Sequence, residues 1–287
     1  MDFFSATSLA FSPDNTLITA AGYGGEINIW RISDGQRLHS LIGSQEPMTN
    51  TDVLAFSPDG QTLVSLAVWP FIEETMRNSL NVWNVANGEK RYSLTGKYTC
   101  AAISPNGQLL ALGSIGRPLS LHRLSNGIRV RQLPFASKPC FDLNFSRDGK
   151  LVAYRTRGVG MPVYRVADGK LVHLLSPDMD ELSHIAISPD GRILAASYYY
   201  VLSLTHTDIF GGPSIQLGSH GRIRFWQLDN GQKMPTLRGH EIGTNRLAFH
   251  PKGKLRSLLL AGMQQFAFGK CHHQLLPGRG CCWLAVC

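Results

Sequence analysis

Two short motifs alternate along this chain of 287 residues, and this repetition constrains the fold more than any other feature. The first motif is a Ser-Pro-Asp-Gly turn or a close variant of it. Its six copies follow the leading residues Phe11, Phe56, Ile103, Phe145, Ile187 and Phe249. The intervals between these leading residues are 45, 47, 42, 42 and 62 residues. Repetition at a nearly fixed period of this size predicts an array of similar structural units.

The second motif places an aromatic residue or a histidine shortly before an Asp-Gly or Asn-Gly pair. Its five copies are residues 29–35, 82–88, 121–127, 163–169 and 225–231. In the first motif, Pro and Asp favour a tight turn, and Gly accepts the left-handed conformation that ends it. Asp-Gly and Asn-Gly are strong signals for a β-hairpin. Both motifs therefore mark turns between strands.

The segments that flank these turns have the composition and the alternation of β-strands. Residues 27–30, 80–83 and 223–226 alternate apolar and polar side chains with period two, as half-buried strands do. Each unit is then a meander of four short strands, a to d. One such sheet cannot cover its own apolar face, whereas sheets stacked radially cover one another, which predicts a β-propeller.

This four-stranded unit, with its Ser-Pro-Asp-Gly turn and a tryptophan on strand c, resembles the WD40 repeat. The resemblance implies an all-β, WD40-like β-propeller with five recognisable four-stranded blades and a partial or degenerate sixth. The blades are expected at about residues 6–41, 52–95, 99–133, 140–175 and 183–237, with the partial sixth at 245–255. The strand-c aromatic residues are then expected to be structural packing residues: Trp30, Trp83, Tyr164 and Trp226.

The sequence also departs from the family pattern. The aspartate that follows the tryptophan in the family is replaced by Arg31, Asn84 and Gln227, and blade 3 carries His122 in place of the tryptophan. The hydrogen-bond network that links these positions in the family is therefore expected to be incomplete. A TolB-like propeller, which shares the Ser-Pro-Asp-Gly turn, is the alternative within propellers.

Residues 1–255 are assigned to the propeller, and residues 256–287 form an atypical tail that is basic and rich in cysteine. After Glu241 the chain has six basic residues and no acidic one, whereas the rest carries 22 basic and 20 acidic side chains. Four of the six cysteines lie in the last 17 residues. A frameshifted or truncated end, or a disordered tail, is the preferred interpretation, and a divergent sixth blade is the alternative.

A metal site in this tail is a further alternative. Its candidate ligands are Cys271, His272, His273, Cys281 and Cys282. Structural zinc sites usually pair ligands two to four residues apart, with a second pair beyond, and the adjacent residues here fit that spacing poorly. We therefore expect no metal ion and no other cofactor.

The chain shows no sign of a membrane or a secretory segment. No apolar run approaches the roughly 18 to 20 residues that a membrane helix needs, and the N-terminus lacks the basic region of a signal peptide. Cys100 and Cys140 stand in apolar contexts and are expected to be small buried residues. These features predict a protein of the cytoplasm, with no contact to a membrane.

Signature motifs of common enzymes are absent. The chain has no Gly-x-Ser-x-Gly, no phosphate-binding Gly-x-x-x-x-Gly-Lys, no Gly-x-Gly-x-x-Gly and no His-Glu-x-x-His. We therefore expect no catalytic residues. The expected function is a non-catalytic scaffold whose top-face loops bind protein partners, since function in a propeller lies on its loops.

Two connections between strands b and c are longer than the others, in blades 2 and 5. They contain aromatic and methionine residues of the types enriched at interaction hot spots. The candidate partner-binding residues are Trp69, Phe71, Met76, Tyr198, Tyr199, Tyr200 and Phe210. Two other interpretations remain open: the loops cover their own blades, or residues 198–200 simply extend strand b.

Blade 3 has a local basic character from Arg117, Arg123, Arg129 and Arg131. A solvated surface is the default interpretation of such charges, and nucleic acid is not expected as a partner. Two alternatives to the protein scaffold stay open: binding of an acidic or RNA ligand, and a TolB-like propeller that serves a hydrolase.

Overall fold

The structure is a computed structural model of the chain. It describes residues 6–22, 24–44, 50–68, 78–134, 140–156, 160–176, 182–207 and 213–240, together with residues 247 and 249. These residues form β-strands and turns without any helix. Accordingly, the described part of the chain holds no helix long and apolar enough to cross a membrane.

Twenty strands form five antiparallel sheets of four, and the strands of each sheet are neighbours in chain order. Blades 1 and 2 consist of β1 (Ala6–Phe11), β2 (Leu17–Gly22), β3 (Glu26–Arg31) and β4 (Arg37–Ile42), then β5 (Asn50–Phe56), β6 (Thr62–Val68), β7 (Asn78–Asn84) and β8 (Lys90–Gly96). Blade 3 consists of β9 (Tyr98–Ile103), β10 (Leu109–Ser114), β11 (Arg117–Arg123) and β12 (Arg129–Gln132). Blades 4 and 5 consist of β13 (Cys140–Phe145), β14 (Leu151–Thr156), β15 (Met161–Arg165) and β16 (Leu171–Leu175), then β17 (Leu182–Ile187), β18 (Ile193–Thr207), β19 (Pro213–Gln227) and β20 (Leu237–His240). The predicted all-β fold with five four-stranded blades is confirmed.

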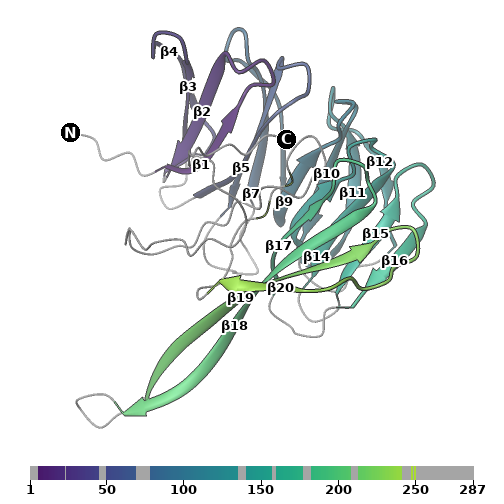
Figure 1. The fold of residues 1–287 in the computed structure, drawn as a ribbon. Helices are drawn as coiled ribbons and strands as arrows, with labels where there is room; N and C mark the ends of the chain where they lie inside the picture. The colour runs from purple at the N-terminus through teal and green to yellow at the C-terminus, as the bar shows by residue number, and fades with distance from the viewer. Residues whose placement is uncertain are drawn as a thin grey trace.

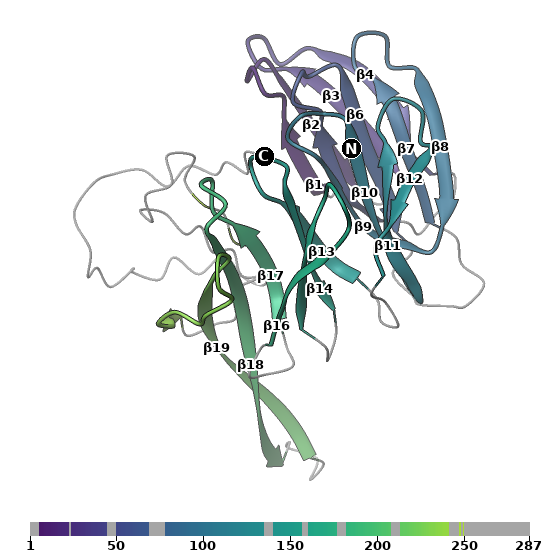
Figure 2. The ribbon, with the colours of Figure 1, turned by 90° about the vertical axis from the view of Figure 1, so that its right-hand side faces the viewer.

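The five blades follow one another in chain order, as Figures 1 and 2 show, and the first strand of each contacts the first strand of the next. The contacts run from β1 to β5, β9, β13 and β17. In the described residues, blades 5 and 1 share no extended strand contact that would close a ring.

The hydrophobic core is divided into layers, each shared by two consecutive blades. Between blades 1 and 2, for example, Ile29 packs with Phe56 and Trp83. The same arrangement recurs between blades 2 and 3, 3 and 4, and 4 and 5. Each blade therefore uses one face toward its predecessor and the opposite face toward its successor. This division follows from the period-two alternation of the strands.

The strand-c residues of blades 2 to 5 lie inside these layers. Trp83, Tyr164 and Trp226 are almost completely buried. The Trp83 Nε1–H donates to Ser65 Oγ at 2.9 Å, so blade 2 retains a link between strands b and c. In blade 3, His122 takes the tryptophan position, and its Nδ1–H donates to the carbonyl oxygen of Gly127 at 2.9 Å. Burial lowers the pKa of His122, which favours the neutral ring.

A fifth hydrophobic layer lies beyond blade 5. Leu247 and Phe249, from the sixth copy of the first motif, pack against Ile223 and Phe225. The sixth repeat thus begins to cover the far face of blade 5, in the way that each blade covers its predecessor. The tail at 256–287 lies outside the described residues, so its interpretation stays a prediction.

Candidate interaction surfaces

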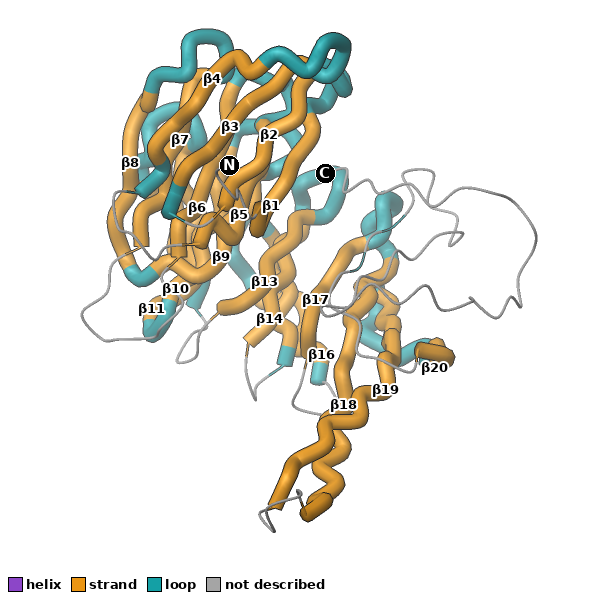
Figure 3. The backbone as a smooth tube through the Cα atoms, turned by 90° about the vertical axis from the view of Figure 1, so that its left-hand side faces the viewer, coloured by secondary structure: helices purple, strands orange, loops and turns teal. Residues whose placement is uncertain are grey.

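The two ends of the blades differ, because consecutive antiparallel strands place their connections alternately. The a–b and c–d turns of all five blades lie at one end, here called the turn face (Figure 3). The b–c and d–a connections lie at the opposite end, here called the loop face. Any surface that uses several blades at once must be built on one of these two ends or on the outer d strands.

The a–b turns on the turn face share one hydrogen-bond geometry. In blade 2, Ser57 Oγ accepts from the Thr62 N–H at 2.9 Å and donates to Asp59 Oδ1 at 2.5 Å, while Asp59 Oδ1 also accepts from the Gln61 N–H at 3.0 Å. The other four blades repeat this arrangement. In each of them, the serine hydroxyl at the equivalent position accepts from a backbone N–H five residues later, and an aspartate or asparagine lies two residues after the serine. The serines are buried, so each supplies a hydroxyl that satisfies backbone groups at the end of a blade.

These hydrogen bonds favour the ionised form of the turn aspartates. Ser57, followed by the Gln61 N–H, lowers the pKa of Asp59. The pKa values of Asp14, Asp148 and Asp190 are also lowered, in each case chiefly by the serine two residues earlier. These four carboxylates therefore stabilise the turn face when they are ionised.

In blades 2, 3 and 4, a side chain of strand d also reaches the c–d turn of the next blade. The Tyr92 hydroxyl donates to the carbonyl oxygen of Leu124 at 2.6 Å. At the equivalent position, Arg131 donates from Nη1 to Asp168 O at 2.8 Å, and His173 Nε2 donates to Leu228 O at 2.9 Å. The turn face is therefore tied from blade to blade.

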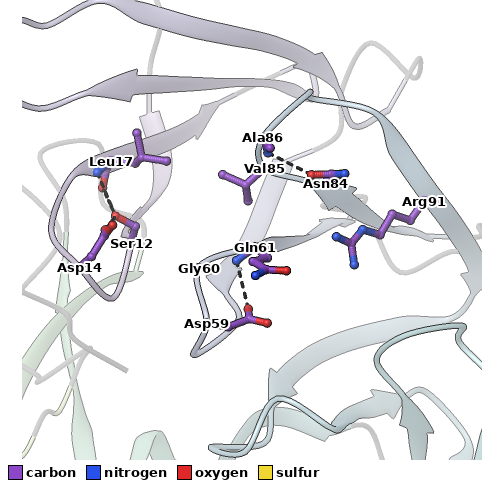
Figure 4. Close-up of a pocket in the computed structure, with 10 residues that line it drawn as sticks. All are labelled: Ser12, Asp14, Leu17, Asp59, Gly60, Gln61, Asn84, Val85, Ala86 and Arg91. Carbon is purple, nitrogen blue, oxygen red and sulfur yellow. Dashed lines mark hydrogen bonds between the residues drawn. The ribbon is translucent and has the colours of Figure 1, made fainter.

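A shallow pocket of about 370 Å³ opens on the turn face between blades 1 and 2. Figure 4 shows the turns of both blades around it, with the Arg91 side chain directed toward it from strand β8. Asn84 lies at its wall, where blades 1, 3 and 4 carry Arg31, Arg123 and Arg165 at the equivalent position. Polar and apolar side chains both line the pocket, and both of its carboxylates, on Asp14 and Asp59, are committed to their own turns.

The loop face varies from blade to blade. Its b–c connection is a short turn in blade 3, where β10 ends at Ser114 and β11 begins at Arg117. In blade 5, by contrast, β18 and β19 are each 15 residues long and pair from Ile193↔Gln227 to Thr207↔Pro213. They extend far beyond β17 and β20 as a two-stranded arm (Figures 1 and 2).

The candidate partner-binding residues are distributed as follows. Tyr198, Tyr199 and Tyr200 lie within β18, where their backbones pair with residues 222, 221 and 220. The interpretation that these residues extend strand b is therefore the one that the structure shows. Trp69, Phe71, Met76 and Phe210 lie outside the described residues, and a role in partner binding stays a prediction for all seven.

The inner strands bring together cysteine, aspartate and histidine side chains from segments that lie far apart in the sequence. Cys100 and Cys140 are both buried, with their sulfur atoms 2.9 Å apart. Burial raises the pKa of the Cys140 thiol, which keeps the sulfur protonated and a poor nucleophile. Nearby along β13, Asp142 Oδ2 accepts from the Ile185 N–H at 2.6 Å and lies 3.5 Å from His184 Nε2.

These contacts indicate a structural use of the acidic and histidine side chains. His184 Nδ1 accepts from the Leu247 N–H at 3.2 Å, which ties the sixth repeat to blade 5. Asp142 likewise ties blade 4 to blade 5. Within the described ranges, no group of three or more His, Cys, Asp or Glu side chains is placed to hold a metal ion.

Comparison with known proteins gives the same class of protein as the fold. The family described as "WD domain, G-beta repeat" matches residues 4–31. The chain is 29% identical over 169 residues to the WD repeat-containing protein SL1-17 of Schistosoma mansoni, an alignment that covers 58% of this chain and 52% of that protein. It is 27% identical over 158 residues to an uncharacterized WD repeat-containing protein of Synechocystis sp., covering 55% of this chain and 40% of that one.

A further relative is Autophagy-related protein 16 of Arabidopsis thaliana, which is 22% identical over 194 residues, covering 66% of this chain and 36% of the relative. The chain thus spans about half the length of the first relative and less of the other two. Sheets of four sequential strands that share hydrophobic layers define a repeat protein of the propeller class. With the matches above, the chain resembles proteins of the WD40 repeat family. Such repeats generally mediate protein–protein interaction, and the proteins are typically non-catalytic scaffolds.

Proposed function

We propose that this protein is a non-catalytic scaffold of the cytoplasm that binds protein partners through its loop face. The observation that carries this proposal is the contrast between the two ends of the blades. The turn face is built from repeated hydrogen bonds that tie blade to blade, whereas the loop face differs in every blade and carries the β18–β19 arm. A rigid set of sheets that presents variable loops loses little conformational entropy on binding.

The chemistry of the inner strands supports a binding role over a catalytic one. The Asp142 carboxylate and the His184 ring accept hydrogen bonds from backbone N–H groups of the next repeat, and the Cys140 thiol is buried. These groups are committed to holding the blades together. Catalysis would instead need such groups to face a substrate within hydrogen-bond reach.

The structure also bears on the alternative of an RNA or acidic ligand. One of the four blade 3 arginines, Arg131, binds the carbonyl oxygens of Ala167 and Asp168 in the next blade. Part of this basic patch therefore has a structural use. A phosphate ligand would show affinity that falls steeply with salt, whereas a flat salt response would dismiss it.

Shortening the arm tests the proposed function. Residues 199–221 are replaced by Asn-Gly, which closes a two-residue hairpin beyond the Tyr198↔Arg222 pair. A second variant replaces residues 70–77 in the blade 2 connection with a short Gly/Ser turn. The matched control is Lys150→Glu, an exposed change on the turn face.

The full chain and each variant are immobilised, and the proteins that each retains are compared. The midpoint of thermal unfolding shows whether each variant is folded. We expect the control to keep the partners of the natural chain, and at least one loop-face variant to lose them at an unchanged midpoint. Equal retention by all folded variants would contradict binding through the loop face.

A further inference from the structure

Cys100 on β9 and Cys140 on β13 bring two thiols together across the boundary between blades 3 and 4. Their sulfur atoms lie 2.9 Å apart, and both cysteines are free. A disulfide bond is about 2.05 Å long, so bonding requires the two sulfurs to approach each other by only about 0.9 Å. A Cβ added at Gly113 would meet both sulfur atoms, so this glycine leaves the space that the pair occupies.

The backbone beside this pair is held by both blades. Strand β9 contacts strand β13, and the Thr99 hydroxyl donates to the carbonyl oxygen of Cys140, which fixes the start of β13 beside β9. Cys140 is the first residue of β13, so it lies at the end of the strand that the d–a connection enters. A bond between the two sulfurs would therefore join blades 3 and 4 at the loop face.

The next blade boundary shows what the cysteines replace. Between blades 4 and 5, Asp142 Oδ2 accepts from the Ile185 N–H at 2.6 Å, and Asn144 Nδ2 donates to the Ile185 carbonyl oxygen at 2.8 Å. Counted back from the leading residue of each first motif, Cys100 and Ala102 stand at the equivalent positions in blade 3. The Ala102 side chain cannot form such a hydrogen bond, and the Cys100 sulfur contacts a second sulfur instead. The boundary between blades 3 and 4 thus carries a pair of thiols where its neighbour carries two hydrogen bonds.

We propose that Cys100 and Cys140 are a reversible redox switch, in which a peroxide links blades 3 and 4 through a disulfide and a dithiol releases them. Two sulfurs already in contact suit this reaction, because the bond forms without rearrangement of the blades. The two cysteines are 40 residues apart in the chain, so the bond closes a long loop. Closing such a loop restricts the unfolded chain and thereby stabilises the folded one.

The oxidation consumes one hydrogen peroxide for each pair of thiols. Burial raises the pKa of Cys140, so Cys140 keeps its proton and the sulfur of Cys100 reacts first. The Cys100 thiolate attacks one peroxide oxygen, the O–O bond breaks, and a sulfenic acid forms. The hydroxide that leaves takes up the proton that Cys100 released, which gives water.

The second thiol completes the bond. The sulfur of Cys140 attacks the sulfenic sulfur of Cys100, the S–O bond breaks, and the proton of Cys140 leaves with the hydroxide as a second water. The two sulfurs lose two electrons in total, and the peroxide gains them. A dithiol reverses the change, since it returns two electrons and two protons to the pair and becomes a disulfide itself.

Burial sets the conditions under which the switch responds. Cys100 is 5% exposed and Cys140 is 3% exposed, so a peroxide reaches them only when the ends of the strands open briefly. The folded chain should therefore respond to sustained peroxide. Once formed, the disulfide opposes the same opening.

Peptide mapping of the purified full chain tests the linkage. Trypsin places the two cysteines on separate peptides, residues 98–123 and 132–147, because proline follows Arg117 and Lys138. The reduced chain is treated with hydrogen peroxide, catalase removes the excess, free thiols are alkylated, and the digest is analysed by mass spectrometry. We expect the two peptides to be joined, and dithiothreitol should separate them. Absence of the joined peptides, or linkage of either cysteine to residues 271–287 instead, would overturn the proposal.

A matched control removes the other thiols of the chain and keeps the pair. It carries four substitutions: Cys271→Ser, Cys281→Ser, Cys282→Ser and Cys287→Ser. Peroxide should join the two peptides in this control and raise its midpoint of thermal unfolding by about 5 °C or more, as expected for a loop of this length. An unchanged or lower midpoint after linkage would overturn the proposal, and neither measurement depends on a substitution in the folded blades.

Two further variants in the same background test the order of the steps. Cys100→Ala and Cys140→Ala should form no joined peptides and show no rise in the midpoint on treatment with peroxide. In Cys140→Ala, a reagent that traps sulfenic acids should label Cys100. Labelling of Cys140 in Cys100→Ala, with no labelling of Cys100 in Cys140→Ala, would overturn the assigned order.

Discussion

The turn face and the loop face are built from the same twenty strands, yet they differ in how tightly sequence determines structure. On the turn face, the serine and the acidic or amide residue of the a–b turn keep one geometry in five blades, and strand d of blades 2 to 4 donates to the next turn. On the loop face, the b–c connection changes from a short turn after Ser114 to the 15-residue strands of blade 5. One end of the molecule holds the repeats in place, and the other is free to vary.

The pKa values of the carboxyl groups also differ between the turn face and the loop face. The described carboxylates with a lowered pKa all lie in turns of the turn face: Asp14, Asp34, Asp59, Asp148, Asp168 and Asp190. In the c–d turns, a backbone N–H two residues ahead is the main cause, as for Asp34 and Gln36. The comparison teaches that charge on the turn face stabilises turns, so acidic residues there are poor evidence for a ligand site.

The largest expected effect separates two glycines with the same backbone conformation. Gly127 on the turn face has φ +72°, and Gly116 on the loop face has φ +65°. An added Cβ at Gly127 would lie 2.8 Å from the Tyr92 ring, whereas nothing lies within 4 Å at Gly116. Alanine at either position would have to adopt the left-handed backbone conformation, which costs about 1–2 kcal/mol of folding stability. Gly127→Ala should cost roughly 1–3 kcal/mol more, because it overpacks the contact between blades.

Denaturant unfolding of the two variants measures this difference directly. If Gly116→Ala destabilises the protein as much as Gly127→Ala does, the close packing of the turn face is not a source of stability. An unchanged slope of free energy against denaturant in both variants would show that the comparison concerns the same folded and unfolded states.

Acid should weaken the turn face before it affects the rest of the molecule. A carboxylate with a lowered folded pKa contributes stability that is fully present above its unfolded value, near 3.8, and is lost as the pH falls through the folded pKa. The free energy of unfolding should therefore decline below about pH 4, with a slope set by the turn aspartates. Urea unfolding at a series of pH values measures that slope.

Blade 3 provides a natural control for this titration. Asn106 replaces the aspartate there, and it still accepts from Ser104 Oγ at 2.7 Å and from the Gln108 N–H at 3.1 Å. Asp59→Asn should therefore keep the turn and remove one titrating group, which makes the acid slope shallower by up to one proton. A slope unchanged by Asp59→Asn would mean that the acid sensitivity arises elsewhere.

The spacing of the motifs was sufficient to predict the fold, because each turn signal is local. Pro58, Asp59 and Gly60 encode a turn within four residues, and period-two alternation encodes which face is buried. The incomplete family network, inferred from Asn84 and Gln227, stays a prediction, and Trp83 keeps a hydrogen bond to Ser65. The arm in blade 5 was predicted only as a long connection, since its pairing depends on register between residues far apart in sequence.

The contacts between blades could not be predicted in the same way. Tyr92 and Leu124 are 32 residues apart, and Cys100 and Cys140 are 40 apart, so only the stacking of sheets brings them together. The two cysteines were expected to be buried, but not to touch. The candidate partner-binding residues remain a prediction, because a loop that varies between repeats offers no internal pattern from which to infer its contacts.

The smallest expected effect concerns a single hydroxyl on the turn face. Tyr92→Phe removes the hydrogen bond to the Leu124 carbonyl and leaves the ring packed, so it should cost about 1 kcal/mol. The matched control is Tyr98→Phe in β9, which removes the hydroxyl of a second half-buried tyrosine. Burial raises the pKa of Tyr92 to about 12, so its stabilising contribution is present below pH 10 and is lost as the pH rises toward 12. Urea unfolding at pH 7 and pH 11 measures the difference in the free energy of unfolding between the natural chain and Tyr92→Phe. This difference should be smaller at pH 11. An equal difference at both pH values would show that this hydroxyl does not tie blade 2 to blade 3.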